Sequence, residues 1–460
     1  MLFNSLQFLV FFMVVTLWFF RLRTQRGRVW LLLLASCYFY LSFVPIYIAI
    51  LGVTIVVDYF AGWQIEKSQG RARKAWLVMS LVFNIGFLAF FKYFNFFTDN
   101  INLLLAATGS ESQLAFLKIA LPIGLSFHTF QAMSYTIEVY RGRHPAERSF
   151  PVYALYVMFY PQLVAGPIER PQNVLPQLKE YREYDYSNVR EGIARMLWGF
   201  FKKVVIADRL AIGVDYAFGH SSELSSAALF TGAVLYSFQI YCDFSGYSDI
   251  GIGAARVMNI KLMENFNQPY ISKSITEFWS RWHISLSTWF RDYVYIPLGG
   301  NQVGEVKRKR NVFVVFLLSG LWHGANWTFV IWGGLHGLLT TILPGSKSPI
   351  KSRIKSWCSG IALFVVVTFF WIFFRAENVG HAVAYIAGIF RFGSGGEHIG
   401  LNNLELGFSL LLIAALMLRE YFYPSHVIRR GRFGWYVALM VALCYWFGVF
   451  NENQFIYFQF

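Results

Sequence analysis

Long apolar segments, separated by short basic loops, follow one another along most of the chain. Several of them reach the roughly 20 residues that a helix needs to cross a bilayer. Arginine and lysine gather in the loops beside them, as in the cytoplasmic loops of multi-pass proteins; these clusters fall within residues 21–28, 67–74, 307–310, 347–355 and 429–432. The pattern predicts an all-α, polytopic integral membrane protein with about eleven helical membrane segments and both termini on the outer side.

The apolar runs define where these segments fall. Residues 115–140 carry Pro122 and Gly124 and predict a broken or re-entrant segment, which is tolerated only where protein or a cavity covers the freed backbone groups. Residues 191–218 predict a helix partly at the interface, and residues 171–190 and 376–404 predict loops. The other predicted membrane helices lie within residues 5–20, 29–61 (two crossings, with Pro45 near the turn), 75–97, 151–168, 226–258, 311–345, 357–374, 405–422 and 434–450.

Composition supports this class of protein and argues against others. The 460 residues are 56% hydrophobic and only 14% charged, whereas a soluble domain carries about 25% charged residues. The net charge of +15 suggests a nucleic-acid-binding protein at first, but the basic residues stand in short loops and not on a polar domain. No polar stretch is long enough for a separate domain, so we expect a single membrane-embedded domain over residues 1–460.

One apolar run, residues 317–343, has a polar centre at His323. An ionisable ring at membrane depth is costly, so we expect it to have a function. On a continuous helix Asn326 lies beside His323, whereas His336, 13 residues further on, faces about 220° away. The glycine pair 333–334 offers a point at which the helix can break. We expect His336 to pack or form hydrogen bonds, with catalysis as the alternative.

A second histidine, His283, stands in the segment 274–298, which predicts an amphipathic helix. Ser274 followed by Glu277 is a capping-box pattern at its start. At 100° per residue His283 shares a stripe with aromatic residues and is expected to point inward, while Arg281 lies on a polar face. The alternative is an interfacial helix whose tryptophans sit at the lipid headgroups and whose histidine is incidental.

Two carboxylates, Asp243 and Asp249, lie inside the apolar span 226–258. Two buried acids suit a proton relay, but they also suit orienting a histidine or capping a broken helix. The small residues among them fit close packing between helices. We favour a structural or supporting role for both acids.

The motifs of several enzyme classes are absent from the sequence. There is no HExxH, no CxxC and no pair of histidines four residues apart, so we expect no metal site and no bound cofactor. There is also no GxSxG nucleophile motif. A lone histidine without a nucleophile suits direct general-base catalysis, in which the imidazole takes a proton from an acceptor hydroxyl as its oxygen attacks an acyl group.

Several longer motifs now point to a family. They are FWSRWHISLS at 278–287, the segment 322–337 around His323, YPQLVAGPIER at 160–170, YCDFSGYSD at 241–249, ENFNQPY at 264–270 and the terminal FQF. Together they resemble the bacterial branch of the membrane-bound O-acyltransferase family, in particular its members of the alginate O-acetyltransferase type. The similarity is densest over about residues 120–340.

The resemblance implies a ring of helices around a membrane-crossing channel, in the cytoplasmic (inner) membrane of a bacterium. It implies that His323 is catalytic and that His283 is a second polar position of the site. We therefore expect both histidines to be catalytic. From the residues themselves we expect five supporting residues: Asn326, Arg281, Asp243, Asp249 and His336. The resemblance further implies acetyl-CoA as a cytoplasmic acyl donor. A partner protein outside the membrane is expected to pass the acetyl group to an exopolysaccharide such as alginate, or to a cell-wall glycan.

Three other functions remain open at this point. The related transfer of D-alanine to teichoic acids shares the expected fold. A transporter or channel is suggested by the broken segment 115–140 together with intramembrane Asp243 and Asp249, although the chain shows no inverted repeat. A non-catalytic scaffold that anchors an extracellular acetylase is the third.

Overall fold

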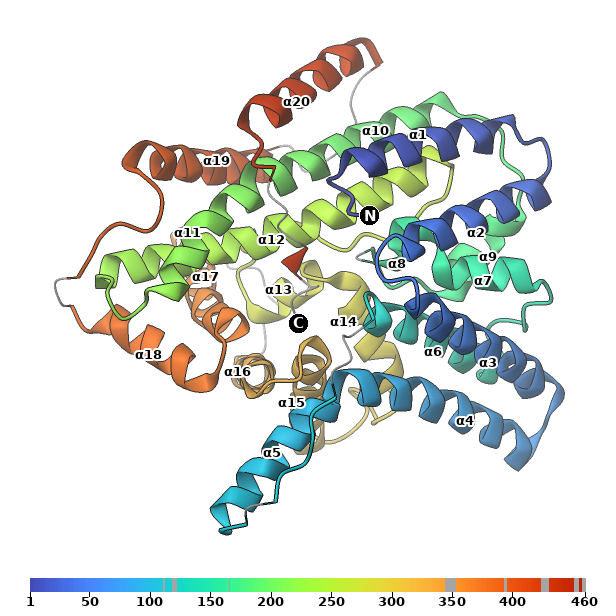
Figure 1. The fold of residues 1–460 in the computed structure, drawn as a ribbon, viewed down its shortest axis with the longest axis horizontal. Helices are drawn as coiled ribbons and strands as arrows, with labels where there is room; N and C mark the ends of the chain where they lie inside the picture. Colours follow the sequence, from blue (N-terminus) through green and yellow to red (C-terminus); the bar gives the residue numbers. More distant parts are fainter. Residues whose placement is uncertain are drawn as a thin grey trace. The chain divides into compact units, whose positions relative to one another are not determined.

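Helices make up the regular secondary structure of this computed structural model, which describes residues 1–110, 112–117, 122–164, 166–343, 353–392, 395–422, 430–450 and 455–456. Within those ranges no strand is formed, so the all-α prediction is confirmed there. The chain divides into two units: Met1–Ile193 with Gly251–Met263, and Ala194–Ile250 with Glu264–Phe460. Figure 1 labels the helices of both units.

The first unit is built around a layer of neighbouring helices in which α6 packs against α3 and α4. Two helices, α10 (Tyr186–Phe200) and α12 (Ser226–Val257), begin in one unit and end in the other. The remaining elements of the first unit are α1 (Leu6–Arg21), α2 (Gln25–Leu41), α3 (Tyr47–Lys67), α4 (Gly70–Leu88), the π-helix η1 (Ala89–Tyr93), α5 (Phe94–Ala107), α6 (Leu125–Tyr140), α7 (Phe150–Met158), α8 (Tyr160–Leu163) and α9 (Pro171–Lys179).

The second unit contains both histidines singled out by the sequence. Its helix α11 packs against the π-helix that precedes it, and α17 packs against α16 and α18. Its elements are the π-helix η2 (Phe201–Ala207), α11 (Asp208–Gly219), the 3-10 turn η3 (Pro269–Ile271), α13 (Ile275–Arg281), α14 (Ile284–Phe290), the π-helix η4 (Arg291–Tyr295), α15 (Glu305–His323), α16 (Trp327–Ile342), α17 (Arg353–Arg375), α18 (Val379–Phe390), α19 (Asn403–Phe422), the 3-10 turn η5 (Arg430–Arg432) and α20 (Phe433–Phe447).

Three of the described helices are long and apolar enough to cross a membrane: Tyr47–Lys67, Gly70–Ala107 and Ile354–Arg375. The apolar helices Leu6–Arg21 and Val379–Phe390 are shorter. Large apolar side chains are exposed along α5, where Phe97 is 56% and Leu104 is 68% accessible. Burying such a surface in lipid is favourable, as expected of a membrane protein. The predicted number of about eleven membrane segments is not confirmed.

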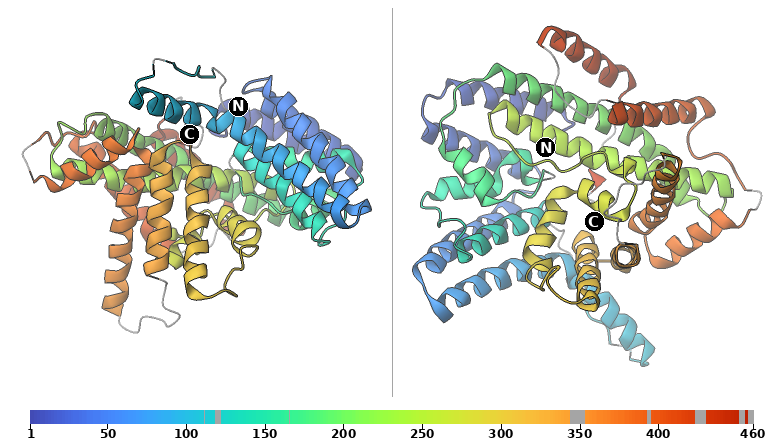
Figure 2. Two further views of the ribbon diagram at one scale, coloured as in Figure 1. Left: turned by 90° about the horizontal axis from the view of Figure 1, so that it is seen from below. Right: turned by 180° about the vertical axis from the view of Figure 1, so that it is seen from behind.

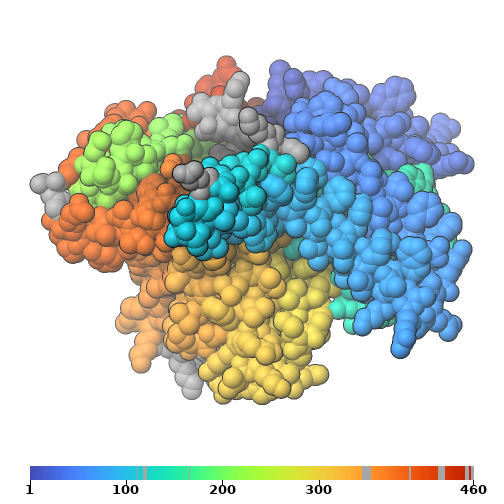
Figure 3. All heavy atoms as spheres, turned by 60° about the horizontal axis from the view of Figure 1, so that its bottom comes forward, coloured from blue at the N-terminus to red at the C-terminus, as the bar shows by residue number. Residues whose placement is uncertain are grey.

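Close packing of small residues joins α15 and α16 into an antiparallel hairpin. A Cβ atom on Gly333 would collide with the carbonyl oxygen of Phe316, and one on Gly320 would collide with that of Phe329. Glycine at these positions therefore lets the two backbones touch. α15, α16 and α17 run side by side in Figure 2, and their gold and orange side chains adjoin in Figure 3.

The structure corrects several predicted boundaries. The loop predicted at 171–190 contains α9, and the loop predicted at 376–404 contains α18, which begins where the Asn378 side chain accepts a hydrogen bond from the backbone N–H of His381, 2.9 Å away. Asparagine is a favoured helix cap, and an apolar helix follows it. The basic residues 347, 351 and 429, Ala165 of the YPQLVAGPIER motif and the terminal FQF lie outside the described residues.

Candidate active site

His323 lies at the tip of the α15–α16 hairpin, as the last residue of α15. The chain turns through Gly324, and α16 begins after Asn326, whose side chain accepts a hydrogen bond from Thr328 N at 3.0 Å. The prediction of one continuous helix through residues 311–345 is therefore wrong. So is the suggested break at glycines 333–334, because these residues lie inside α16 and the break falls at 324–326.

Asn326 consequently shapes the turn and does not share a helix face with His323. Its side chain caps α16 on one side, and its Nδ2 donates to the backbone oxygen of Glu377, 2.9 Å away, on the other. Asparagine is among the best N-cap residues because its oxygen satisfies a backbone N–H that has no partner within the helix. The prediction that Asn326 lies beside His323 on one helix face is therefore wrong.

His283 also lies at a break between two helices. Its backbone has φ 43° and ψ 53°, in the left-handed region, between α13 and α14. The predicted cap at the start of α13 is confirmed in part: Ser274 Oγ accepts from Glu277 N at 3.2 Å, whereas the Glu277 carboxylate accepts from Lys273 N at 2.9 Å and not from Ser274 N. The single helix predicted over 274–298 is wrong, because Asn265 accepts a hydrogen bond from Ile284 N at 2.9 Å and thereby replaces an intrahelical partner.

These two breaks bring the two histidines together. The ring centroids of His283 and His323 are 6.4 Å apart. Both rings are buried, with 0% and 4% of their surface exposed. A pair of imidazoles in surroundings with little water can take up and release a proton next to a bound substrate. The site thus has the groups that general-base chemistry requires.

Aromatic rings surround the histidine pair. Phe244 meets His283 edge to face, with centroids 4.6 Å apart. His323 is flanked by Trp332 at 5.1 Å and Phe374 at 5.3 Å. Such edge-to-face contacts restrict the rotation of a ring beyond what burial alone does. The orientation of each imidazole is therefore set by its neighbours.

His336 lies behind Trp332 and belongs to the packing around the site. Its ring is 4.9 Å from the Trp332 ring, and its Nδ1 accepts a hydrogen bond from Trp279 Nε1 at 3.3 Å. The ring is fully buried. These contacts agree with the packing and hydrogen-bonding role expected for His336.

Arg281 stabilises the backbone before α13. Its guanidinium lies 3.0 Å from the Glu277 carboxylate and donates at 3.1 Å to the backbone oxygen of Asn267. It was expected on a polar face of a continuous helix. Because that helix is broken, Arg281 instead ties α13 to the segment 264–268.

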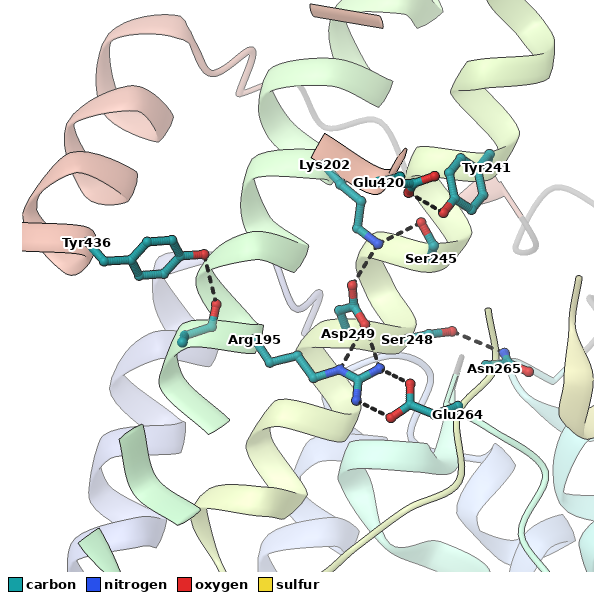
Figure 4. A network of polar contacts seen from close by, with 11 residues as sticks. Arg195, Lys202, Tyr241, Ser245, Ser248, Asp249, Glu264, Asn265, Glu420 and Tyr436 are labelled. Carbon is teal, nitrogen blue, oxygen red and sulfur yellow. Dashed lines mark hydrogen bonds and ion pairs between the residues drawn. The ribbon is translucent and has the colours of Figure 1, made fainter. Parts of the chain in front are cut away.

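Asp249 belongs to a buried ionic network, shown in Figure 4. Its carboxylate lies 2.8 Å from Arg195 and 2.6 Å from Lys202. Arg195 also pairs with Glu264, and Lys202 donates to Ser245 Oγ at 2.8 Å. Opposite charges at these distances compensate one another, as buried ions must.

Asp243 has a comparable but separate set of partners. It pairs with Lys203 at 2.6 Å, and Lys203 also lies 2.8 Å from Asp208. The second oxygen of Asp243 accepts a hydrogen bond from Ile456 N at 2.8 Å, so it holds the segment near the C-terminus. This pairing of both acids with cations favours the structural interpretation over a proton relay.

Lys202 and Lys203 were missed by the sequence analysis. They are 3% and 1% exposed and lie in the π-helix η2, within the apolar stretch that was predicted to sit partly at the interface. The sequence could have identified them: two lysines flanked by phenylalanine and valine are costly to bury, and the same cost of burial drew attention to His323. π-helical turns are often found at functional sites.

The described ranges hold no group of three or more histidine, cysteine, aspartate or glutamate residues placed to bind a metal ion. The four cysteines, of which Cys242 is buried, are all free thiols.

Comparison with known proteins identifies related sequences over most of the chain. A model of the membrane-bound O-acyltransferase family matches residues 46–377. A probable alginate O-acetylase of Pseudomonas aeruginosa is 39% identical, covering 92% of this chain and 82% of the relative. A peptidoglycan O-acetyltransferase of Helicobacter pylori is 36% identical, covering 82% and 75%. A teichoic acid D-alanyltransferase of Bacillus subtilis is 32% identical, but covers only 48% of this chain and 58% of the relative.

Proposed function

The chain belongs to the membrane-bound O-acyltransferase family, and on that premise we propose that it moves acetyl groups from cytoplasmic acetyl-CoA to a polysaccharide outside the membrane. The buried pair His283 and His323, 6.4 Å apart, is the observation that carries this proposal. Two relatives that match most of this chain are named as a probable alginate O-acetylase and a peptidoglycan O-acetyltransferase. An exopolysaccharide or a cell-wall glycan is therefore the proposed acceptor.

His323 is the proposed general base. It removes the proton of an acceptor hydroxyl while the hydroxyl oxygen attacks the carbonyl carbon of the acetyl thioester. A carbon–oxygen bond forms and the carbon–sulfur bond breaks. The imidazole then gives its proton to the departing thiolate, so that coenzyme A leaves as a thiol. His283, whose ring centroid lies 6.4 Å from that of His323, positions a substrate or assists the proton transfer.

The proposed setting is the cytoplasmic membrane of a bacterium, crossed several times by the chain. The apolar helices Tyr47–Lys67 and Ile354–Arg375 support membrane insertion. The basic residues 307–310, which lie in the first turns of α15, support a cytoplasmic location for that end of the hairpin. The proposal also includes a partner protein on the outer side. This partner receives the acetyl group and delivers it to the glycan.

D-alanyl transfer to teichoic acid is the competing activity. Its support is the related D-alanyltransferase, which covers about half of this chain. The acetylating relatives cover most of the chain at higher identity, and this difference favours acetyl transfer.

The proposal is tested in a bacterial strain from which the gene for this chain has been deleted. The strain is complemented with the wild type, with His323→Ala or with His144→Ala, and ester-bound acetate in the extracted glycans is measured at equal membrane levels of protein. His144 is a partly exposed histidine of the first unit and serves as the matched control. We expect His323→Ala to lower the rate of acetylation about 100-fold or more, the contribution of a general base. Wild-type acetylation by that variant would refute the proposal, and ester-bound alanine in place of acetate would favour D-alanyl transfer.

A further inference from the structure

A single asparagine, Asn265, binds both the side chain and the backbone next to His283. It is fully buried. Its Oδ1 lies 3.0 Å from His283 Nδ1, 2.8 Å from Ser285 Oγ and 3.3 Å from Ser285 N. Its Nδ2 donates to Ser248 Oγ at 3.1 Å. Its own backbone oxygen accepts from Ile284 N at 2.9 Å.

The contact with Ser285 N fixes which way the Asn265 amide points. A backbone N–H donates and does not accept, so the amide atom that faces it is the oxygen. The same oxygen faces His283 Nδ1, and an amide oxygen offers only lone pairs. That contact is a hydrogen bond only when His283 Nδ1 carries the proton; the other group within range of Nδ1, Ser285 Oγ, is further away at 3.5 Å. In a neutral imidazole the lone pair then resides on Nε2.

We propose that Asn265 is a positioning residue for the acyl transfer, because it holds His283 as the Nδ1–H tautomer and so directs a basic Nε2 toward the reacting groups. The role of Asn265 in catalysis rests on the proposed function, because it requires that His283 takes part in acetyl transfer. A histidine that must accept a proton or a hydrogen bond at one nitrogen is commonly oriented by an acceptor at the other. Asn265 is the acceptor that the structure provides.

The surroundings of Asn265 support such a role. Its sequence neighbour Glu264 pairs with Arg195, which also binds Asp249 of α12, and Figure 4 shows this network beside Ser248 and Asn265. The segment that carries Asn265 is therefore tied to α12 at two adjacent residues. The edge-to-face contact of Phe244 with the His283 ring, at 4.6 Å, further limits ring rotation.

The tautomer is measured directly by nitrogen-15 NMR of the full-length chain in lipid nanodiscs, with nitrogen-labelled histidine and with His283→Gln to assign the signals. The wild type is expected to show protonated Nδ1 and unprotonated Nε2 at His283. Asn265→Leu removes the acceptor and is expected to abolish that preference. Asn265→Asp retains an oxygen at the same place, to which Ser248 Oγ can donate, and is expected to preserve it. A wild-type His283 protonated at Nε2 would overturn the proposal.

Glycan acetylation in the complemented deletion strain supplies the functional test. We expect Asn265→Leu to slow acetylation about 10- to 100-fold, as when a group that orients a histidine is lost, and Asn265→Asp to restore most of the rate. The control is Asn267→Ala, which removes an exposed asparagine of the same segment while leaving its backbone contacts intact. A changed tautomer with unchanged acetylation in Asn265→Leu would overturn the role in the reaction.

If the chain does not transfer acetyl groups, the glycans of the deletion strain carry the same amount of ester-bound acetate with and without the wild-type chain. This result differs from the one that would refute the role of Asn265. The NMR comparison of the wild type with Asn265→Leu still decides whether Asn265 sets the tautomer of His283.

Discussion

At the scale of single residues, one rule was useful for prediction: a polar group in an apolar segment is costly to bury and is therefore expected to have a role. That rule selected His323 and His283, and the structure brings their rings together. Applied to Lys202 and Lys203, it would have found the partners of Asp249 and Asp243 as well. The same rule could not identify Asn265, because an asparagine in a polar segment is not expected to be buried. Only the fold shows which groups it contacts.

The ionic network around Asp249 gives a prediction at this scale. Asp249→Asn leaves buried Lys202 and partly buried Arg195 without their shared counter-charge and is expected to destabilise the protein by about 3–5 kcal/mol. The control is Asp215→Asn, because Asp215 pairs with Arg375 at 2.8 Å with a carboxyl side chain that is 58% exposed. A surface pair of that kind contributes about 0–1 kcal/mol. Thermal unfolding in detergent measures both variants, and equal midpoints for the two would contradict the structural role of Asp249.

At the scale of elements, hydrophobic runs predicted where most helices lie but not where they break. The spans predicted at 226–258 and 357–374 are α12 and α17, within a few residues. The breaks at His283 and at Gly324 were missed. The break at His283 depends on Asn265, a residue outside the helix pattern that binds the interrupted backbone. A local periodicity contains no information about such a contact.

The α15–α16 hairpin provides the prediction for this scale. Gly333→Ala adds a methyl group against the Phe316 carbonyl oxygen and is expected to destabilise the hairpin by about 1–3 kcal/mol, the usual effect of overpacking. Gly334→Ala is the matched control, since the nearest atom to its new Cβ is Leu317 Cδ2 at 3.5 Å, an ordinary contact. Alanine there is expected to be neutral or to stabilise the helix by about 0.5–1 kcal/mol. Thermal unfolding in which Gly333→Ala is as stable as Gly334→Ala would argue against close backbone packing.

At the scale of the whole molecule, composition and basic loops predicted the class of protein, and the family match agrees with it. The number of membrane segments was less predictable, because helices such as Leu6–Arg21 are apolar but short. Partly buried helices pack against protein as well as lipid, so hydropathy alone does not separate a membrane span from a core helix. Whatever the number of membrane segments, the proposed reaction requires an acetyl donor on one side of the membrane and a glycan acceptor on the other.

Proteoliposomes test that requirement most directly. The purified chain is reconstituted with carbon-14-labelled acetyl-CoA enclosed in the lumen and mannuronate oligosaccharides outside, together with a membrane extract from the deletion strain that supplies outer-side partners. We expect labelled ester on the external oligosaccharide with the wild type and with His144→Ala, and a loss of about 100-fold or more with His323→Ala. Labelled product formed equally well by His323→Ala would contradict this expectation.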